Sequence, residues 1–270
     1  MLIPTLPARA VKDKDSHAGE PLFLTGEGLF LLPMSTSDEK IARGRVLVIG
    51  VGGLGAPAAT ALAAAGVGTL GLIDPDAVEL SNLHRQPLYA SADVGRAKVE
   101  VAAERLGALA PALRVETWHA RFGPADAHLL RRFDVVLDGT DTIAAKFVVN
   151  DAAILAGVPL VHAGVLGFRA QLLTVLPGRS ACYRCIFEEA PPPGDVPSCQ
   201  EAGVLGPVAA LAGALQAAEA IRLLAGDPAA YANALFAIDT QAGSWRTVPL
   251  APSPRCPVCA PRAVERSHAP

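Results

Sequence analysis

The chain has 270 residues, half of them apolar, and a formal net charge of −3 with a pI near 6. That length and composition are enough to bury the core of one large α/β domain, or of one domain with a small lobe. The near-neutral charge excludes the broad basic surface expected of a protein that binds nucleic acid or an anionic membrane.

The first part of the chain, residues 1–40, is expected to be irregular. Its charges, prolines and glycines are scattered without an apolar period. It has no basic region followed by an apolar run, so we do not expect a secretory signal there. The remainder, residues 41–270, is expected to form a single domain.

Strands and helices alternate after this segment. Strand RVLVIG leads through GVGGLG into a helix, TLGLID is the second strand, and a helix is expected over roughly Val94–Leu109. Strand RVETWHA, a helix before Arg132, strand DVVLDG, a helix through Asn150 and strand PLVHAGV follow. This alternation predicts a Rossmann-like, doubly wound and mostly parallel sheet.

The pattern changes in the C-terminal third of the chain. QLLTVLPGR, LFAIDT and WRTVPL are typical of hairpin strands, so an antiparallel C-terminal portion of the same sheet is expected. The long apolar run Pro207–Gly226 carries Gln216, Glu219 and Arg222 at three-residue spacing. This polar stripe predicts a helix packed on the core rather than a membrane span.

The turn after the first strand has the spacing of a phosphate-binding loop. Gly50, Gly52 and Gly55 form G-x-G-x-x-G between a strand and a helix, and the acidic Asp74 follows about 20 residues later. Glycines let backbone amides approach phosphates at a helix N-terminus, and a carboxylate accepts hydrogen bonds from ribose hydroxyls. A tight turn that binds nothing is the alternative.

Three charged residues favour a triphosphate over a nicotinamide dinucleotide. A triphosphate brings about four negative charges, which Arg and Lys side chains neutralise in a partly dry cleft. Arg85 in SNLHRQ and Lys98 at a helix start supply cations, and Asp141 in DGTDT is placed to hold Mg²⁺ at the carboxyl end of a strand. Solvated surface charges are the alternative for Arg85 and Lys98.

Four of the five cysteines form two C-x-x-C pairs, Cys182 with Cys185 and Cys256 with Cys259. Two such pairs on distant segments are typical of a structural, tetrahedral zinc site with four thiolates. Two redox dithiols or four incidental thiols are the alternatives. Reduced, metal-bound cysteines favour a cytoplasmic location over a secreted disulfide framework.

Several of these stretches together resemble a known family. GVGGLG, LIDPD, SNLHRQ, VGRAKVE, DGTD, NDAAILAGVPLV, CYRC, CPVC and SCQEAGVLGPV are similar to those of the ubiquitin-activating-enzyme-like adenylyltransferases, the ThiF/MoeB/HesA group, over about residues 43–260. The resemblance implies a homodimer that uses ATP and Mg²⁺ to adenylate the C-terminal glycine of a ubiquitin-like sulfur-carrier protein ending in Gly-Gly. Pyrophosphate would leave, and sulfur transfer for thiamin, molybdopterin or another cofactor would follow.

The resemblance also implies roles for individual residues. It places the phosphates at Gly50, Gly52, Gly53 and Gly55, the ribose at Asp74, and the triphosphate along Ser81, Asn82, Arg85 and Lys98, with magnesium on Asp141. The carboxylate that attacks is already ionised near neutral pH, so no general base is needed and catalysis rests on positioning and charge neutralisation. His84 is then left with a local structural role.

The fifth cysteine, Cys199, ends the proline-rich loop PPPGDVPSC before the long helix. A helix N-terminus lowers the pKa of a nearby thiol and favours reactivity. The resemblance implies that this position can form a covalent link with the carrier during sulfur transfer. An unreactive thiol in a crossover loop is the alternative.

Two departures from the family pattern keep other functions open. GEGLFLLP stands where family members carry an arginine that reaches the partner subunit's ATP, and Thr142 stands where Asn is more common. A specialised or non-catalytic relative acting on a peptide or a tRNA is therefore one alternative. An NAD-dependent oxidoreductase is another, but it leaves Arg85, Lys98, Asp141 and the paired cysteines unexplained.

Overall fold

The computed structural model describes residues 36–189 and 203–260. Every described element belongs to one compact unit, Met34–Pro270. Its first helix, α1 (Thr36–Arg43), begins within the segment that the sequence analysis expected to be irregular. Acidic residues in its first turn and basic residues in its last turn suit the helix dipole, and Ile41 packs against the core. A helix this short and polar leaves little periodic signal in the sequence.

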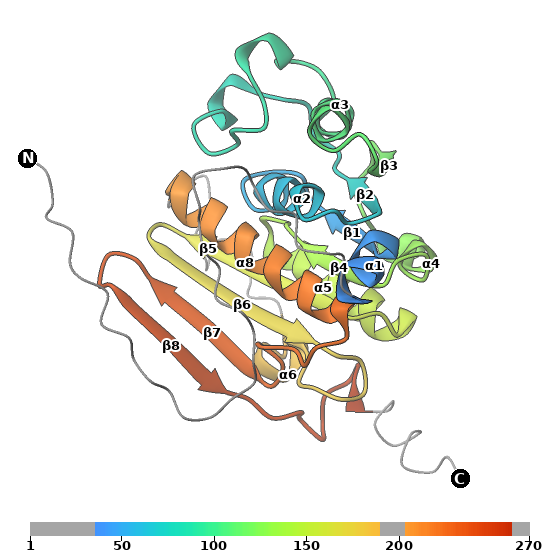
Figure 1. Ribbon diagram of the computed structural model, residues 1–270. Helices are drawn as coiled ribbons and strands as arrows, with labels where there is room; N and C mark the ends of the chain where they lie inside the picture. Colours follow the sequence, from blue (N-terminus) through green and yellow to red (C-terminus); the bar gives the residue numbers. More distant parts are fainter. Residues whose placement is uncertain (1–35, 190–202, 261–270) are drawn as a thin grey trace, which may run out of the picture. The chain divides into compact units, whose positions relative to one another are not determined.

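The described strands form one eight-stranded sheet in the order β3-β2-β1-β4-β5-β6-β7-β8 (Figure 1). Its parallel part consists of β1 (Arg45–Ile49), β2 (Thr69–Ile73), β3 (Arg114–Trp118), β4 (Val135–Asp138) and β5 (Leu160–Leu166). The antiparallel part consists of β6 (Arg169–Val175), β7 (Ala234–Asp239) and β8 (Ser244–Pro249). The predicted mixed α/β sheet with an antiparallel C-terminal portion is confirmed.

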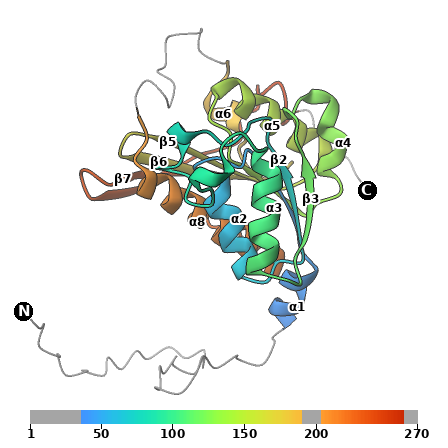
Figure 2. The same cartoon turned by 90° about the horizontal axis from the view of Figure 1, so that it is seen from above.

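Helices cover both faces of the parallel part, as Figure 2 shows. The first face carries α2 (Gly55–Ala64), α3 (Lys98–Leu109) and α8 (Gly206–Ala225), and the second carries α4 (Ala127–Leu130), α5 (Ile143–Ala156) and α6 (Tyr183–Ile186). Short 3-10 turns lie at Leu80–Asn82, Ser91–Asp93 and Pro124–Asp126. Strand order reverses between β1 and β4, and ligands of doubly wound sheets bind at the carboxyl ends of the strands at such a point.

One helix differs in detail from the sequence expectation, and the long apolar helix agrees with it. Helix α3 begins at Lys98 rather than near Val94, because Gly95 has a φ of 90° and Ala97 forms a bridge with Ala77. Helix α8 is long and apolar enough by composition to cross a membrane, yet it packs on α2 and the sheet as predicted. Its polar residues Gln216 and Glu219 are buried on that packed face, where each has hydrogen-bond partners.

Candidate functional site

Two glycines in the turn between β1 and α2 are required by close backbone packing. Gly50 has a φ of 85°, and a Cβ there would lie 2.8 Å from the carbonyl oxygen of Gly139. A Cβ on Gly55 would overlap the carbonyl oxygen of Gly50. Any larger residue at these positions would push β1, α2 and the loop after β4 apart, so Gly50 and Gly55 serve the packing of the protein itself.

The other two glycines of the turn have space around them. The nearest atoms to a Cβ on Gly52 and on Gly53 are Gln86 Nε2 at 3.4 Å and Ala209 Cβ at 3.6 Å. The protein fold therefore does not require glycine at either position. A bare backbone beside the first turn of α2 is what a phosphate needs in order to approach the amide groups.

Asp74 lies at the end of β2 and fixes the shape of this turn. Its carboxylate is 4% exposed and accepts hydrogen bonds from Val51 N at 2.7 Å and Asp76 N at 2.8 Å. Burial raises the pKa of Asp74, while the nearby Lys98 ammonium opposes that shift. Each carboxylate oxygen keeps a second lone pair, so a ribose hydroxyl could still donate to this group.

The SNLHRQ segment holds its arginine in a preset position. Glu79 Oε2 accepts from Ser81 Oγ and Asn82 Nδ2, both at 3.1 Å, and Asn82 Oδ1 accepts from Arg85 Nη2 at 2.7 Å. Arg85 Cγ would lie 3.7 Å from a Cβ on Gly53, so the guanidinium stem adjoins the phosphate turn. The backbone of His84 packs closely against the start of α8, since a Cβ on Gly206 would lie 2.9 Å from the His84 carbonyl oxygen.

Lys98 is buried at the start of α3 and points back to the segment after β2. Its Nζ donates to Asp76 Oδ2 at 3.0 Å, while the Asp76 side chain remains 58% exposed. The sequence analysis did not select Asp76, although it is the second acid of LIDPD. An ammonium group has three donors, so Lys98 can hold this carboxylate and contact a phosphate oxygen as well.

Asp141 lies on the exposed loop between β4 and α5. The loop contacts the phosphate turn directly, since a Cβ on Gly139 would lie 2.6 Å from the Gly50 carbonyl oxygen. Thr142, the departure from the family pattern, accepts from Ala145 N at 3.2 Å and caps α5. The hard oxygen donors of an exposed carboxylate at this sheet edge fit Mg²⁺ bound to phosphates.

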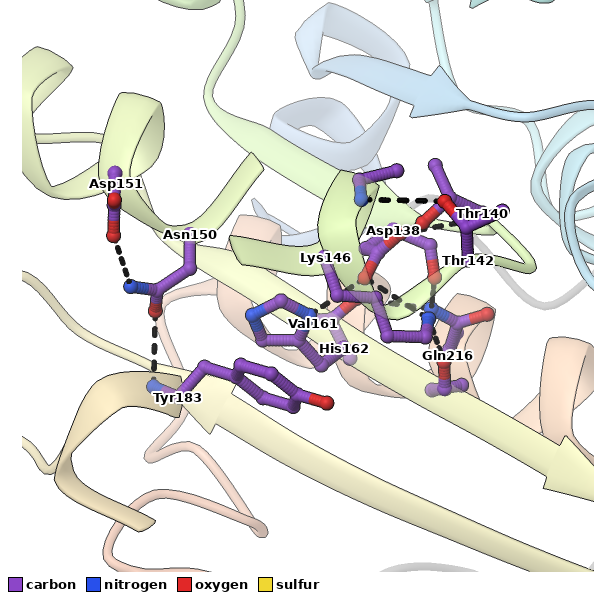
Figure 3. Close-up of polar contacts among 12 residues, drawn as sticks. Asp138, Thr140, Thr142, Lys146, Asn150, Asp151, Val161, His162, Tyr183 and Gln216 are labelled. Carbon is purple, nitrogen blue, oxygen red and sulfur yellow. Dashed lines mark hydrogen bonds and ion pairs between the residues drawn. The ribbon is translucent and has the colours of Figure 1, made fainter. Parts of the chain in front are cut away.

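A buried polar cluster beneath this loop was missed by the sequence analysis (Figure 3). Asp138, fully buried at the end of β4, accepts from His162 Nδ1 at 2.7 Å and Lys146 Nζ at 3.1 Å. Burial acts to raise its pKa, but the Lys146 charge and the His162 hydrogen bond hold the pKa of Asp138 well below the usual range. Burial also lowers the pKa of His162. A lone Lys in IAAKFVV and a lone His in PLVHAGV were the available signals.

The two C-x-x-C pairs form a single four-sulfur cluster. The Sγ atoms of Cys182 and Cys185 are 3.8 Å apart, those of Cys182 and Cys256 3.6 Å, and those of Cys185 and Cys259 3.4 Å. All four lie within 4.8 Å of one another. Sulfurs placed tetrahedrally about 2.3 Å from zinc are about 3.8 Å apart, so the cluster fits this metal. Burial raises the pKa of Cys182 to about 12, so a cation is needed to hold it as a thiolate.

Two of the predicted features lie outside the described residues. These are Cys199 and the GEGLFLLP segment, residues 26–33. Every other predicted site residue is described, and the residues predicted to bind the nucleotide lie around the carboxyl ends of β1, β2 and β4.

The sequence matches the ThiF family over residues 30–258. A protein named sulfur carrier protein adenylyltransferase from Thermus thermophilus is 44% identical, over 85% of this chain and 87% of its own length. The SAMP-activating enzyme E1 of Haloferax volcanii is 41% identical, over 84% of each chain. The probable adenylyltransferase/sulfurtransferase MoeZ of Mycobacterium tuberculosis is 42% identical, and the match spans 57% of its length.

Solved structures of MccB from Escherichia coli have the same fold. The structure with MccA-N7isoASN superposes with a TM-score of 0.74 at 25% identity and covers 83% of this chain and 69% of that one. The structure of MccB with ATP gives a TM-score of 0.72 at 26% identity, over 83% and 68% of the two chains.

Proposed function

Because this chain belongs to the ThiF family, we propose that it adenylates the C-terminal glycine of a ubiquitin-like sulfur-carrier protein with ATP and releases pyrophosphate. The observation that carries the proposal is the glycine turn after β1, residues 50–55. Packing within the protein does not require glycine at Gly52 or Gly53, and Arg85 lies beside Gly53. The names of relatives at 41 to 44% identity support the choice of substrate.

The reaction needs charge neutralisation more than proton transfer. An oxygen of the carrier carboxylate attacks the α-phosphorus, the bond from that phosphorus to the bridging oxygen breaks, and pyrophosphate takes the electron pair. Arg85 and Lys98 would neutralise the negative charge that gathers on the leaving pyrophosphate. Asp74 and Glu79 hold the turn and the SNLHRQ segment in place, so this charge meets donors that are already oriented.

Two metal ions belong to the proposal. Asp141 would hold Mg²⁺, which when bound neutralises charge on the phosphates. The four cysteines would hold zinc in a closed site that leaves no position for substrate, so its role would be structural. Zinc would join the segment after β8 to the start of α6, and thereby anchor the antiparallel part of the sheet.

The likeness to MccB supports a second candidate, in which the substrate is a peptide rather than a carrier protein. MccB is a microcin C7 biosynthetic enzyme whose structure has been solved in complex with N-formylated MccA. We prefer the sulfur carrier because identity to the carrier adenylyltransferase is 44% against 25% to MccB. A homodimer, in which a partner subunit completes the ATP site, is also part of the proposal and rests on the family resemblance.

ATP–pyrophosphate exchange tests the proposal with a purified carrier ending in Gly-Gly. The control is the same carrier without its last glycine. Exchange that needs the intact tail and survives Cys199→Ala would place the first chemical step in the nucleotide site and leave Cys199 for later transfer. ATP binding without exchange for any glycine-ended carrier would favour the peptide substrate or a non-catalytic role.

A further inference from the structure

The buried cluster around Asp138 has no part in the chemistry described above. Its carboxylate is completely enclosed, and four donor groups from three segments converge on it: Lys146 Nζ, His162 Nδ1, Thr140 N and Thr140 Oγ1. A buried carboxylate is costly to maintain unless such partners compensate it.

The end of β4 is held from both faces of the sheet. On the α5 face, Lys146 Nζ links Asp138 to the Ala163 carbonyl oxygen of β5 at 2.6 Å. The Tyr183 ring covers His162 with ring centroids 4.9 Å apart. On the α8 face, Gln216 Nε2 donates to the Asp138 and Val161 carbonyl oxygens at 3.0 and 2.9 Å. We refer to Asp138, Lys146, His162 and Gln216 as the β4 clamp.

The clamp fixes both ends of the loop that carries Asp141. The Thr140 backbone and hydroxyl bind Asp138 Oδ1 at 2.9 and 2.6 Å, which sets the bend just before Asp141. At the other end of the loop, Lys146 in the first turn of α5 donates a hydrogen bond to Asp138 Oδ2. Both ends of the loop are therefore bound to one carboxylate, and its first residue, Gly139, lies against Gly50 in the turn after β1.

We propose that the β4 clamp positions Asp141 for the magnesium–ATP complex, with His162 and Lys146 as positioning residues. The inference rests on the proposed function, because it takes Asp141 as the magnesium ligand. Residues that orient a metal ligand through hydrogen bonds commonly change metal affinity by about 10- to 100-fold when they are lost. A buried ion pair that only stabilises the fold would have no such effect.

The test compares His162→Leu with His162→Asn in the full-length protein. Asn can place an amide N–H where Nδ1–H lies and donate to Asp138, whereas Leu cannot. Thr174→Val is the matched control, because it removes a buried hydrogen bond of 2.7 Å between Thr174 on β6 and Glu219 on α8 and leaves the hydrogen bonds to the Asp138 carboxylate intact. ATP affinity is measured by calorimetry with and without Mg²⁺.

We expect Mg²⁺ to increase the ATP affinity of the wild type. In His162→Leu, this magnesium-dependent increase should be about tenfold smaller, while the ATP affinity measured without Mg²⁺ should change little. His162→Asn and Thr174→Val should keep the gain. An unchanged gain in His162→Leu overturns the inference, as does an equal loss in His162→Asn or Thr174→Val. A wild type whose ATP affinity does not respond to Mg²⁺ overturns it too.

If His162→Leu does not fold, Gln216→Met gives a milder test, since it leaves the ion pair intact and removes only the hydrogen bonds to the Asp138 and Val161 carbonyl oxygens. Its expected result is a smaller loss of the same magnesium-dependent gain, and no loss overturns the inference. Failure of the proposed function looks different: magnesium-dependent ATP binding would be present and pyrophosphate exchange absent. The calorimetric comparison does not require exchange.

Discussion

The proposed nucleotide site and the cysteine cluster are built in opposite ways. Around the carboxyl ends of β1, β2 and β4, the protein's own hydrogen bonds hold each loop: Asp74 to Val51, Asn82 to Arg85, and Asp138 to Thr140. The cysteine cluster instead brings together two segments 74 residues apart through contacts between thiols. Hydrogen bonds between thiols are weak, so under the proposal a bound zinc ion would supply much of the cohesion there.

This structural difference predicts different roles for the two proposed ligands, ATP and zinc. ATP would enter a site whose shape is already set, so loss of a ligand-facing residue should reduce the chemistry and leave the fold intact. Zinc would complete a structure that depends on it, so loss of a cysteine should loosen the fold far from the reacting atoms. Single substitutions in each region test this separation, beginning with the largest effect.

The sharpest contrast lies within the phosphate turn itself. Gly55→Ala should prevent folding, because its Cβ would overlap the Gly50 carbonyl oxygen. Gly53→Ala should fold with a Tm within about 2 °C of the wild type, since its Cβ would fit, yet bind ATP at least about tenfold more weakly. Thermal unfolding and ATP titration of both variants check this. A folded Gly55→Ala protein would contradict the packing role of that glycine.

Cys182→Ser should break the cysteine cluster. Three thiolates form a poor site, so we expect loss of bound zinc and a decrease of several kcal/mol in the free energy of unfolding, on the order of 3 to 5. Metal analysis and denaturant unfolding measure both quantities, with Cys199→Ala as the control cysteine. Wild-type protein purified without chelator and found free of zinc would refute this half of the comparison.

Arg85→Ala should lower the rate of adenylation without lowering the stability of the fold. Removing one oriented charge from a site that stabilises a transition state costs about 100-fold in rate, or about 2.7 kcal/mol. The Tm should stay close to that of the wild type, because Arg85 is partly exposed and its hydrogen bonds among the described residues stay within its own loop. Arg114→Ala, which removes an exposed ion pair with Glu116 on β3, is the control. Unfolding of Arg85→Ala would contradict its assignment.

The smallest effect concerns acid and the β4 clamp. Burial lowers the pKa of His162 in the folded protein, whereas the unfolded chain binds that proton near pH 6.5. The unfolded state therefore binds more protons below pH 6.5, and stability decreases as pH falls, by at most about 1.4 kcal/mol per pH unit. Denaturant unfolding at about pH 7.5 and about pH 6 should show a smaller decrease for His162→Asn than for the wild type. Equal decreases would exclude His162 as the source.

The sequence predicted the sheet, the phosphate turn and the cysteine cluster because each has a local pattern: alternating elements, spaced glycines, paired cysteines. It could not separate the roles of the four glycines, since that depends on how close Gly139 and Ala209 lie in space. It also missed the Lys98–Asp76 pair and the β4 clamp. The clamp joins β4, α5, β5 and α8. The contacts of its buried lysine and histidine depend on how these elements pack, which a local sequence pattern does not reveal.

Mass spectrometry of the carrier and its nucleotide products after a single turnover tests the central claim most directly. The account predicts a carrier that bears AMP on its C-terminal glycine, with one pyrophosphate released for each AMP transferred, and about 100-fold slower formation with Arg85→Ala. ADP and inorganic phosphate as products would contradict it, because the attack would then be at the γ-phosphorus. So would tight ATP binding that leaves the carrier unmodified.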